Sequence, residues 1–196
     1  MAWEQAEALR SQAPVRTFLG RLTDAHTEER SWRVGAKGEE AVADQLARLR
    51  GRDPRWGYLN AVPVGTRGSD IDHVIMGPGG VFTINAKHHP GGKVWVAGTT
   101  LMVNGKKRPY IRNAVHEGDR ASRLLSAACG FHVSVFPMIV LVGHASLTIR
   151  TPPEGVLLVN RRQLSKFLRR LPDAVPPSEL GVILDQARIS TTWSSR

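Results

Sequence analysis

Apolar residues recur with two different periods along the chain, and the change of period separates predicted helices from predicted strands. From about Glu28 to Arg50 they recur every three or four positions, which predicts an amphipathic helix. The positions that define this helix are Val34, Val42, Leu46 and Leu49. Residues 1–30 carry few apolar positions, so we expect a helical lead-in there and the main domain over residues 31–196.

Strand-like alternation begins after this helix. A strand is predicted over Tyr58–Val64, and the two clearest strands are predicted over Asp70–Met76 and Val81–Lys87. The turn GPGG joins the last two and is so short that the pair must be an antiparallel hairpin. A smaller hairpin is predicted from residues 94–96 and 101–103, followed by a turn at NGKK.

The second half of the chain returns to helices around one apolar strand. VFPMIVLV, at residues 135–142, is continuously apolar and is expected to be a central strand buried on both faces. The other predicted elements are a helix over Asn113–Cys129, a strand over Val156–Val159, a basic helix from Asn160 or Arg161 to Leu171, and a last helix capped by Ser178 that ends near Arg188. This order predicts an α/β (α+β) domain with a central mixed β-sheet flanked by helices.

Polar side chains of the predicted hairpin gather on one face. Asp70 and Asp72 share a face because strand residues alternate, whereas His73 points to the other face. On the partner strand Asn85 and Lys87 share a face. The turn between the strands therefore brings Asp72 close to the other two, either as a reactive group or as a structural salt bridge from Asp72 to Lys87.

This combination of side chains suits metal-assisted hydrolysis of phosphodiesters. Carboxylates hold Mg²⁺, which prefers oxygen ligands, and a lysine orients the attacking water or stabilises the developing charge. Asn85 offers a neutral oxygen where a second carboxylate is expected, and Asp70 is interpreted as a cap of the preceding turn.

Three segments resemble the nuclease-related domain (NERD) family. They are GAKGEEAVADQL in the first long helix, DIDHVIMGPGGVFTINAKHHPGG in the hairpin and RPYIRNAVHEGDRASRLL in the next helix, within roughly residues 32–145. The resemblance implies a restriction-endonuclease-like core related to the PD-(D/E)XK nucleases. In that core an acid of the first helix, an aspartate of the second strand and an acid-x-Lys pair of the third strand bind the metal.

Carried over to this chain, the resemblance implies a site of Glu39 or Glu40, Asp72, Asn85 and Lys87. Glu117 matches a position where the family often has glutamine. The metal ligands would be Asp72, Glu39 or Glu40, and Asn85, with Mg²⁺ or Mn²⁺ as the cofactor. Because Asn85 replaces an acid, catalysis depends on the remaining carboxylates, and Asn85→Asp is expected to restore a ligand without disturbing packing.

The charge of the chain favours a polyanionic partner. Lys and Arg number 27 against 17 Asp and Glu, a net charge of +10, which favours DNA over a membrane surface but also fits a generally basic, soluble protein. The residues expected to contact nucleic acid are Lys87, His88, Arg112, Arg120, Arg161 and Arg162. His73, His88 and His89 are interpreted as surface or nucleic-acid contacts rather than zinc ligands.

Three functional hypotheses follow. The first is a Mg²⁺-dependent DNA nuclease or DNA-processing factor. The second is a catalytically inactive nucleic-acid-binding module of the same fold, and the third is an adaptor that binds another protein. The single cysteine, Cys129, is expected to be a buried structural thiol and suits a cytoplasmic protein, and no apolar run is long enough to cross a membrane.

Overall fold

The computed structural model describes residues 33–64 and 69–194 of the chain. The described residues from Lys37 onward belong to one compact unit, which holds both sheets. The predicted lead-in of residues 1–30 lies outside the described residues. Within them, residues 33–52 are helical, as the apolar spacing predicts. No helix of the described part is long and apolar enough to span a membrane.

The first sheet has five strands in the order β1-β2-β3-β7-β9. Its strands are β1 (Gly57–Val64), β2 (Ser69–Gly77), β3 (Gly80–His88), β7 (Val135–Val142) and β9 (Leu157–Asn160). β1, β2 and β3 are antiparallel neighbours, whereas β3, β7 and β9 run parallel. The predicted hairpin and the mixed sheet are therefore confirmed.

The second sheet has four strands in the order β6-β5-β4-β8. Its strands are β4 (Lys93–Gly98), β5 (Thr100–Val103), β6 (Lys106–Arg108) and β8 (Ser146–Pro153). β4 follows β3 and β8 follows β7, and β4 pairs with β8 in parallel as β3 does with β7. Backbone hydrogen bonds from His89 N to Val142 O and from Ala145 N to Gly92 O join the turns between the sheets.

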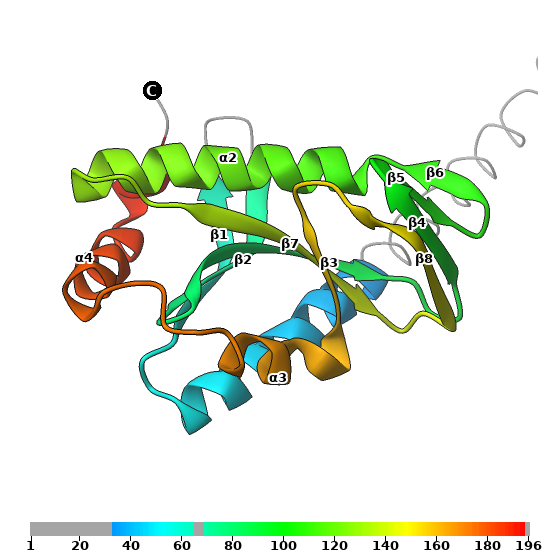
Figure 1. Cartoon of the computed structure of the whole chain (residues 1–196), viewed down its shortest axis with the longest axis horizontal. Helices are drawn as coiled ribbons and strands as arrows, with labels where there is room; N and C mark the ends of the chain where they lie inside the picture. Colours follow the sequence, from blue (N-terminus) through cyan, green and yellow to red (C-terminus); the bar gives the residue numbers. More distant parts are fainter. Residues whose placement is uncertain (1–32, 65–68, 195–196) are drawn as a thin grey trace, which may run out of the picture. The chain divides into compact units, whose positions relative to one another are not determined.

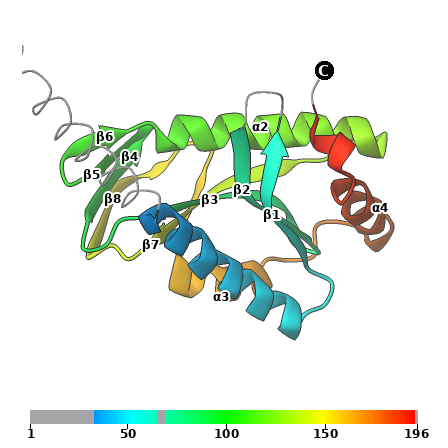
Figure 2. The same ribbon diagram turned by 180° about the vertical axis from the view of Figure 1, so that it is seen from behind.

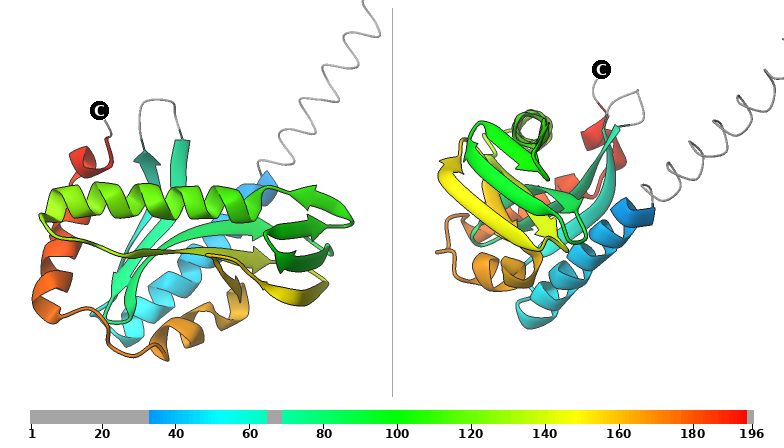
Figure 3. Two further views of the ribbon diagram at one scale, coloured as in Figure 1. Left: turned by 45° about the horizontal axis from the view of Figure 1, so that its top comes forward. Right: turned by 90° about the vertical axis from the view of Figure 1, so that its right-hand side faces the viewer.

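Helices cover both faces of the first sheet (Figures 1 and 2). On one face lies α2 (Tyr110–Cys129), which extends from the first sheet to the second (Figure 3). On the other face lie residues 37–52 of the first helix and α3 (Leu164–Arg169). β7 contributes Met138 and Val140 to one core and Ile139 and Leu141 to the other, so its predicted burial on both faces is confirmed.

Several boundaries differ from those predicted. α2 begins at Tyr110 rather than Asn113, because Pro109 precedes it with a φ suited to a helix start. α4 (Pro177–Ala187) begins at a proline after Pro176, and Ser178 lies inside it rather than capping it. β6 and β8 were not predicted: β6 is the short basic segment KKR, and the apolar alternation of β8 is limited to Leu147 and Ile149.

The packing of α2 against β7 fixes the height of the helix above the sheet. A Cβ atom at Gly118 of α2 would lie 3.1 Å from Cβ and Cδ of Pro137 in β7. Any side chain at this position would require Pro137 or α2 to shift by a few tenths of an ångström, and Glu117 is the neighbour of Gly118 in the helix. The close contact therefore determines how far the Glu117 side chain reaches toward the sheet.

We expect Gly118→Val to lower the free energy of unfolding by about 1–3 kcal/mol, because the added methyl groups force α2 away from Pro137. The matched control is Gly181→Val in α4, where a Cβ meets no atom within 4 Å. That change should shift the free energy by less than about 0.5 kcal/mol, since valine and glycine differ little in helix propensity. Urea unfolding followed by circular dichroism measures both, and equal effects would contradict the close-packing argument.

Candidate active site

The candidate site lies where β2 and β3 separate. The backbone pairing of these strands runs from Gly77–Gly80 to His73–Ile84 and goes no further. Beyond it, the Asp72 carboxylate takes the place of a backbone acceptor, because its Oδ2 accepts a hydrogen bond of 2.7 Å from the Ala86 amide. Asp72 is thus held beside the backbone between Asn85 and Lys87.

The neighbouring strand is also irregular at this point. The β1–β2 register passes from Asn60–His73 to Val62–Ile71 and skips Ala61, which lies opposite Asp72. Ala61 has a φ of 48°, a left-handed conformation that costs a non-glycine residue about 1 kcal/mol. Backbone strain of this kind is tolerated where the surrounding structure enforces it, often at functional sites.

Asn85 connects β3 to α2. Its side chain is 7% exposed, and its Nδ2 donates to both carboxylate oxygens of Glu117 at 2.9 Å. Its Oδ1 is buried and has no hydrogen-bond partner among the described residues. An unsatisfied buried acceptor is costly and therefore marks a position where a donor or a cation would be stabilised.

Lys87 is held by an aromatic side chain that was not predicted to belong to the site. Its Nζ lies 5.2 Å from the centre of the Tyr110 ring, within the range of a cation–π interaction. Tyr110 in turn stacks on His89, with ring centres 5.7 Å apart, and its hydroxyl is hydrogen-bonded to His89 Nε2 at 3.2 Å. Strand alternation could not identify Tyr110, because it lies in the first turn of α2.

The first helix contributes one of the two glutamates named in the sequence. Glu39 is half-buried, and Asp72, Asp70 and Lys87 are close enough to shift its pKa. Glu40 is exposed to solvent. This part of the helix approaches β3 closely, since a Cβ at Gly38 would lie 2.7 Å from Cβ of His88. Of the two, Glu39 is therefore the one that lies beside the site.

Three carboxyl groups of the site are harder to ionise than usual. Burial raises the pKa of Asp72, and the Lys87 ammonium and the Ala86 amide oppose that rise. Burial also raises the pKa of Glu117, opposed by the Asn85 hydrogen bond, and the Asp72 charge adds to it. Glu39 has a raised pKa for the same two reasons, burial and Asp72. Several carboxyl groups that are buried together and raise one another's pKa are typical of catalytic sites.

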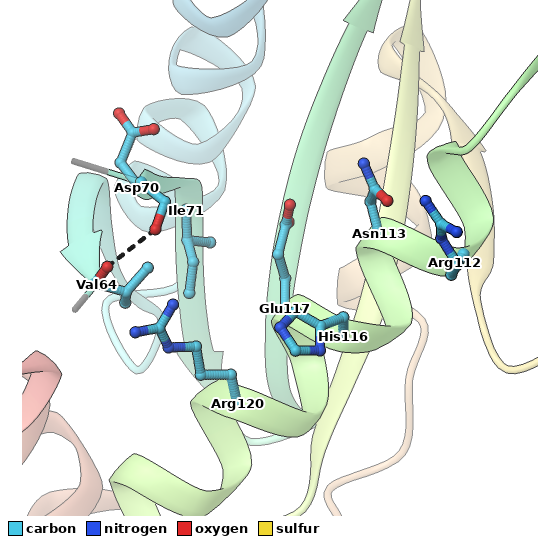
Figure 4. Close-up of a pocket in the computed structure, with 9 residues that line it drawn as sticks. Val64, Asp70, Ile71, Arg112, Asn113, His116, Glu117 and Arg120 are labelled. Carbon is cyan, nitrogen blue, oxygen red and sulfur yellow. Dashed lines mark hydrogen bonds between the residues drawn. The ribbon is translucent and has the colours of Figure 1, made fainter. Parts of the chain in front are cut away.

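A pocket of about 430 Å³ opens beside these groups, between α2 and the β1–β2 hairpin (Figure 4). Glu117 points from α2 toward the sheet, and Arg120 reaches toward Val64 and Ile71. Arg112, His116 and Arg120 line the pocket from successive turns of α2. A basic rim therefore adjoins the acidic centre, and it includes two arginines that were named from the sequence.

Other residues named from the sequence lie further away or differ from expectation. His73 is 2% exposed and its Nδ1 is hydrogen-bonded to Asn60 Oδ1, so its predicted surface role is wrong. His88 packs against Gly38 and Gly143. Arg161 and Arg162 follow β9 at the same edge of the parallel strands as Lys87, because Lys87 pairs with Leu141 and Leu141 with Asn160. Cys129 is half-buried rather than buried.

The oxygen atoms at the site suit a hard cation better than zinc. Asp72, Asn85, Glu39 and Glu117 are oxygen donors, and the partnerless Asn85 Oδ1 is one that a cation would satisfy. Among residues 33–64 and 69–194, no three His, Cys, Asp or Glu side chains are close enough to enclose an ion. A site here would rely on one or two carboxylates and on water, as Mg²⁺ sites do.

The model of the nuclease-related domain (NERD) matches residues 34–142. The match covers more than half of the chain and includes every residue of the candidate site. No curated protein and no solved structure matches the chain.

Asp72→Asn is expected to stabilise the protein by about 1 kcal/mol at neutral pH, because it removes a buried charge and keeps an acceptor for Ala86. The folded pKa of Asp72 is raised above its ordinary value of 3.8, so the wild type loses stability as pH rises through the folded pKa. The difference between variant and wild type should therefore grow as pH rises from about 4 to 7.

Urea unfolding across this pH range measures the difference. Burial lowers the pKa of His73 to about 4, but both proteins carry His73, so its contribution cancels. The matched control, Asp185→Asn, removes a carboxylate that is 77% exposed and should change stability little at any pH. A difference for Asp72→Asn that does not vary with pH would contradict the prediction.

Proposed function

The chain belongs to the nuclease-related domain (NERD) family, and on this basis we propose that it is a Mg²⁺- or Mn²⁺-dependent nuclease acting on DNA. The proposed catalytic residues are Asp72, Asn85, Lys87, Glu39 and Glu117. The family assignment supports a nuclease-related activity. The arrangement of these side chains supports metal-assisted hydrolysis of a phosphodiester.

The observation that carries the proposal is the contact between Asn85 and Glu117. The nuclease pattern calls for an acid at position 85, and this chain has a neutral amide there. That amide donates to both oxygens of a buried carboxylate from α2. We propose that Glu117 supplies the negative charge that position 85 lacks. The carboxylate at this place in the site would then come from α2 instead of β3.

The oxygens that would hold the metal are those of Asp72, Asn85 Oδ1 and a glutamate. The Ala86 amide donates to Oδ2 of Asp72, which fixes the position of the carboxylate. When bound, the metal would polarise the phosphate and lower the pKa of a coordinated water. The unsatisfied Asn85 Oδ1 and the raised pKa values of the acids would both be relieved by a cation.

Lys87 is proposed to stabilise the charge that develops on the phosphate oxygens as water attacks phosphorus. Tyr110 holds the ammonium group in place, which limits the rearrangement needed in the transition state. Glu39 is proposed to accept the proton of the attacking water, since its half-buried carboxyl has a raised pKa. The bond from phosphorus to the leaving oxygen then breaks, and that oxygen takes a proton from solvent.

The surroundings of the site suit a phosphate backbone. Arg112, His116 and Arg120 lie on successive turns of α2 along the pocket. Two arginines and a histidine spaced in this way can contact successive phosphates while the acids face the reacting one. Arg161 and Arg162, at the same edge of the sheet as Lys87, are proposed as a second contact with the backbone.

Exchanging the two groups of the Asn85–Glu117 pair tests the role of Glu117. Glu117→Gln should lower Mg²⁺- or Mn²⁺-dependent cleavage of plasmid DNA about a hundred-fold or more, because the charge is lost. Asn85→Asp with Glu117→Gln returns a carboxylate to β3 and an amide to α2, and should recover most of that activity. The affinity for the metal, measured by calorimetry, should likewise fall in Glu117→Gln and recover in the double variant.

The single change Asn85→Asp is expected to be less favourable than the sequence alone indicates. It places a carboxylate in contact with that of Glu117, where the amide now lies at 2.9 Å, so the metal-free protein should lose stability. The expected cost is electrostatic, because the side chain keeps its shape and two carboxylates come into contact. Lys87→Ala, which should abolish cleavage and keep DNA binding within a few-fold, is the control for contaminating nucleases.

If the wild type and the exchanged pair both fail to cleave with either metal, the nuclease proposal is wrong. Retained DNA binding would then favour the inactive nucleic-acid-binding module, which the amide at position 85 independently suggests. Absence of both activities would favour an adaptor that binds protein.

DNA binding should weaken steeply with salt, because each phosphate contact releases counterions. With a net charge of +10, we expect affinity for a duplex to fall about a hundred-fold between roughly 50 and 200 mM salt, as for about four contacts. Arg112→Gln with Arg120→Gln should reduce the slope, whereas Arg188→Gln in the turn after α4 should not. Fluorescence anisotropy measures the slopes, and salt-independent binding would contradict the proposal.

A further inference from the structure

One face of the second sheet lies outside the apolar cores that the described residues form. Its strands alternate between buried residues (Val94, Val96, Leu101 and Val103) and half-buried ones. The buried set packs against α2 and β7. The opposite face contains Trp95 and Met102, which belong to none of the three apolar clusters formed by the described residues. We call this surface the outer face.

One row of side chains crosses all four strands of the outer face. Trp95 pairs with Met102 on one side and with Thr148 on the other, and Met102 pairs with Lys107. Directly opposite residues share a face and lie about 5 Å apart, so the row presents an aromatic ring, a thioether and an ammonium group in succession. Large apolar side chains beside a cation, outside any core, indicate a surface for binding.

The charge of this sheet is of one sign. Its four strands carry Lys93, Lys106, Lys107, Arg108 and Arg150 and contain no aspartate or glutamate. Each of these five residues is exposed. Lys93 and Lys107 share the outer face with Trp95 and Met102, whereas Lys106 and Arg108 pair with Val103 and Leu101 of the buried set. Two lysines beside a tryptophan, on a sheet whose strands carry no acid, favour a polyanion that also carries flat apolar groups.

We infer that the outer face of the second sheet binds single-stranded nucleic acid. Bases of a single strand are free to stack on Trp95 and Met102, whereas those of a duplex are stacked on each other, and the lysines contact the phosphates. The identification of the polyanion rests on the proposed function. β4, which carries Trp95, begins directly after the turn that follows Lys87 and His88.

Binding of the full chain to short labelled oligonucleotides in EDTA tests the inference without any cleavage. Trp95→Leu should weaken affinity for a single strand about ten-fold and leave affinity for a blunt duplex within about two-fold, because only the single strand loses stacking. Trp95→Tyr, which keeps an aromatic ring, should restore most of the single-strand affinity. Fluorescence anisotropy provides the readout, and thermal unfolding confirms that each variant is folded.

Matched controls separate stacking and charge from general effects. Phe136→Leu changes another aromatic residue, 49% exposed on β7, and should leave both affinities unchanged. Lys107→Gln should lower the salt slope by about one, whereas Arg48→Gln, an exposed cation of the first helix, should not. Unchanged single-strand affinity in Trp95→Leu, or an equal loss for single strand and duplex, would overturn the inference.

A change of oligomeric state in Trp95→Leu, seen by size-exclusion chromatography with unchanged affinity, would assign the face to a second copy of the chain and also overturn it. The outcome is independent of the nuclease proposal, because no metal is present. A protein that binds single strands through Trp95 but never cleaves would keep this inference and lose the proposed activity.

Discussion

The candidate site depends on the hydrogen bond from the Ala86 amide to the Asp72 carboxylate. At this point β2 and β3 stop pairing, and a side chain replaces the backbone acceptor that the sheet would otherwise provide. The bond holds a charge in a place where burial disfavours it, and Lys87 partly compensates that charge. The separation of the strands and the position of the acid therefore have one cause, since a continuous ladder would leave no room for a carboxylate between them.

The rest of the fold supplies a rigid frame for this opening. β7 is buried on both faces and carries β3 beside it in parallel, so the end of β3 that bears Lys87 cannot shift without disturbing two cores. α2 packs closely against β7 at Gly118, and this contact positions the adjacent Glu117 beside the sheet. The site thus combines an irregular edge, where ligands can enter, with a central pair of strands that resists movement.

The hairpin was predictable from the sequence because its two strands alternate with period two and its turn allows no other pairing. That geometry placed Asp72 near Asn85 and Lys87 from spacing alone. The contact with Glu117 was not predictable in this way, because it depends on the rotation of α2 about its axis and on the tight approach at Gly118. The contacts of Tyr110 with Lys87 and His89 were not predictable for a similar reason, as they form only after α2 has packed against the sheet.

The spacing of the contacts along the chain has a consequence for the order of folding. Asp72 and Ala86 are 14 residues apart, whereas Asn85 and Glu117 are 32 apart and have the whole of β4, β5 and β6 between them. Closing the shorter loop costs less chain entropy, so the hairpin contact can form early and locally. Glu117 reaches Asn85 only when α2 docks on a completed β3–β7 pair. A partly folded or newly synthesised chain therefore lacks the full set of oxygen donors, and only the finished domain can present them together.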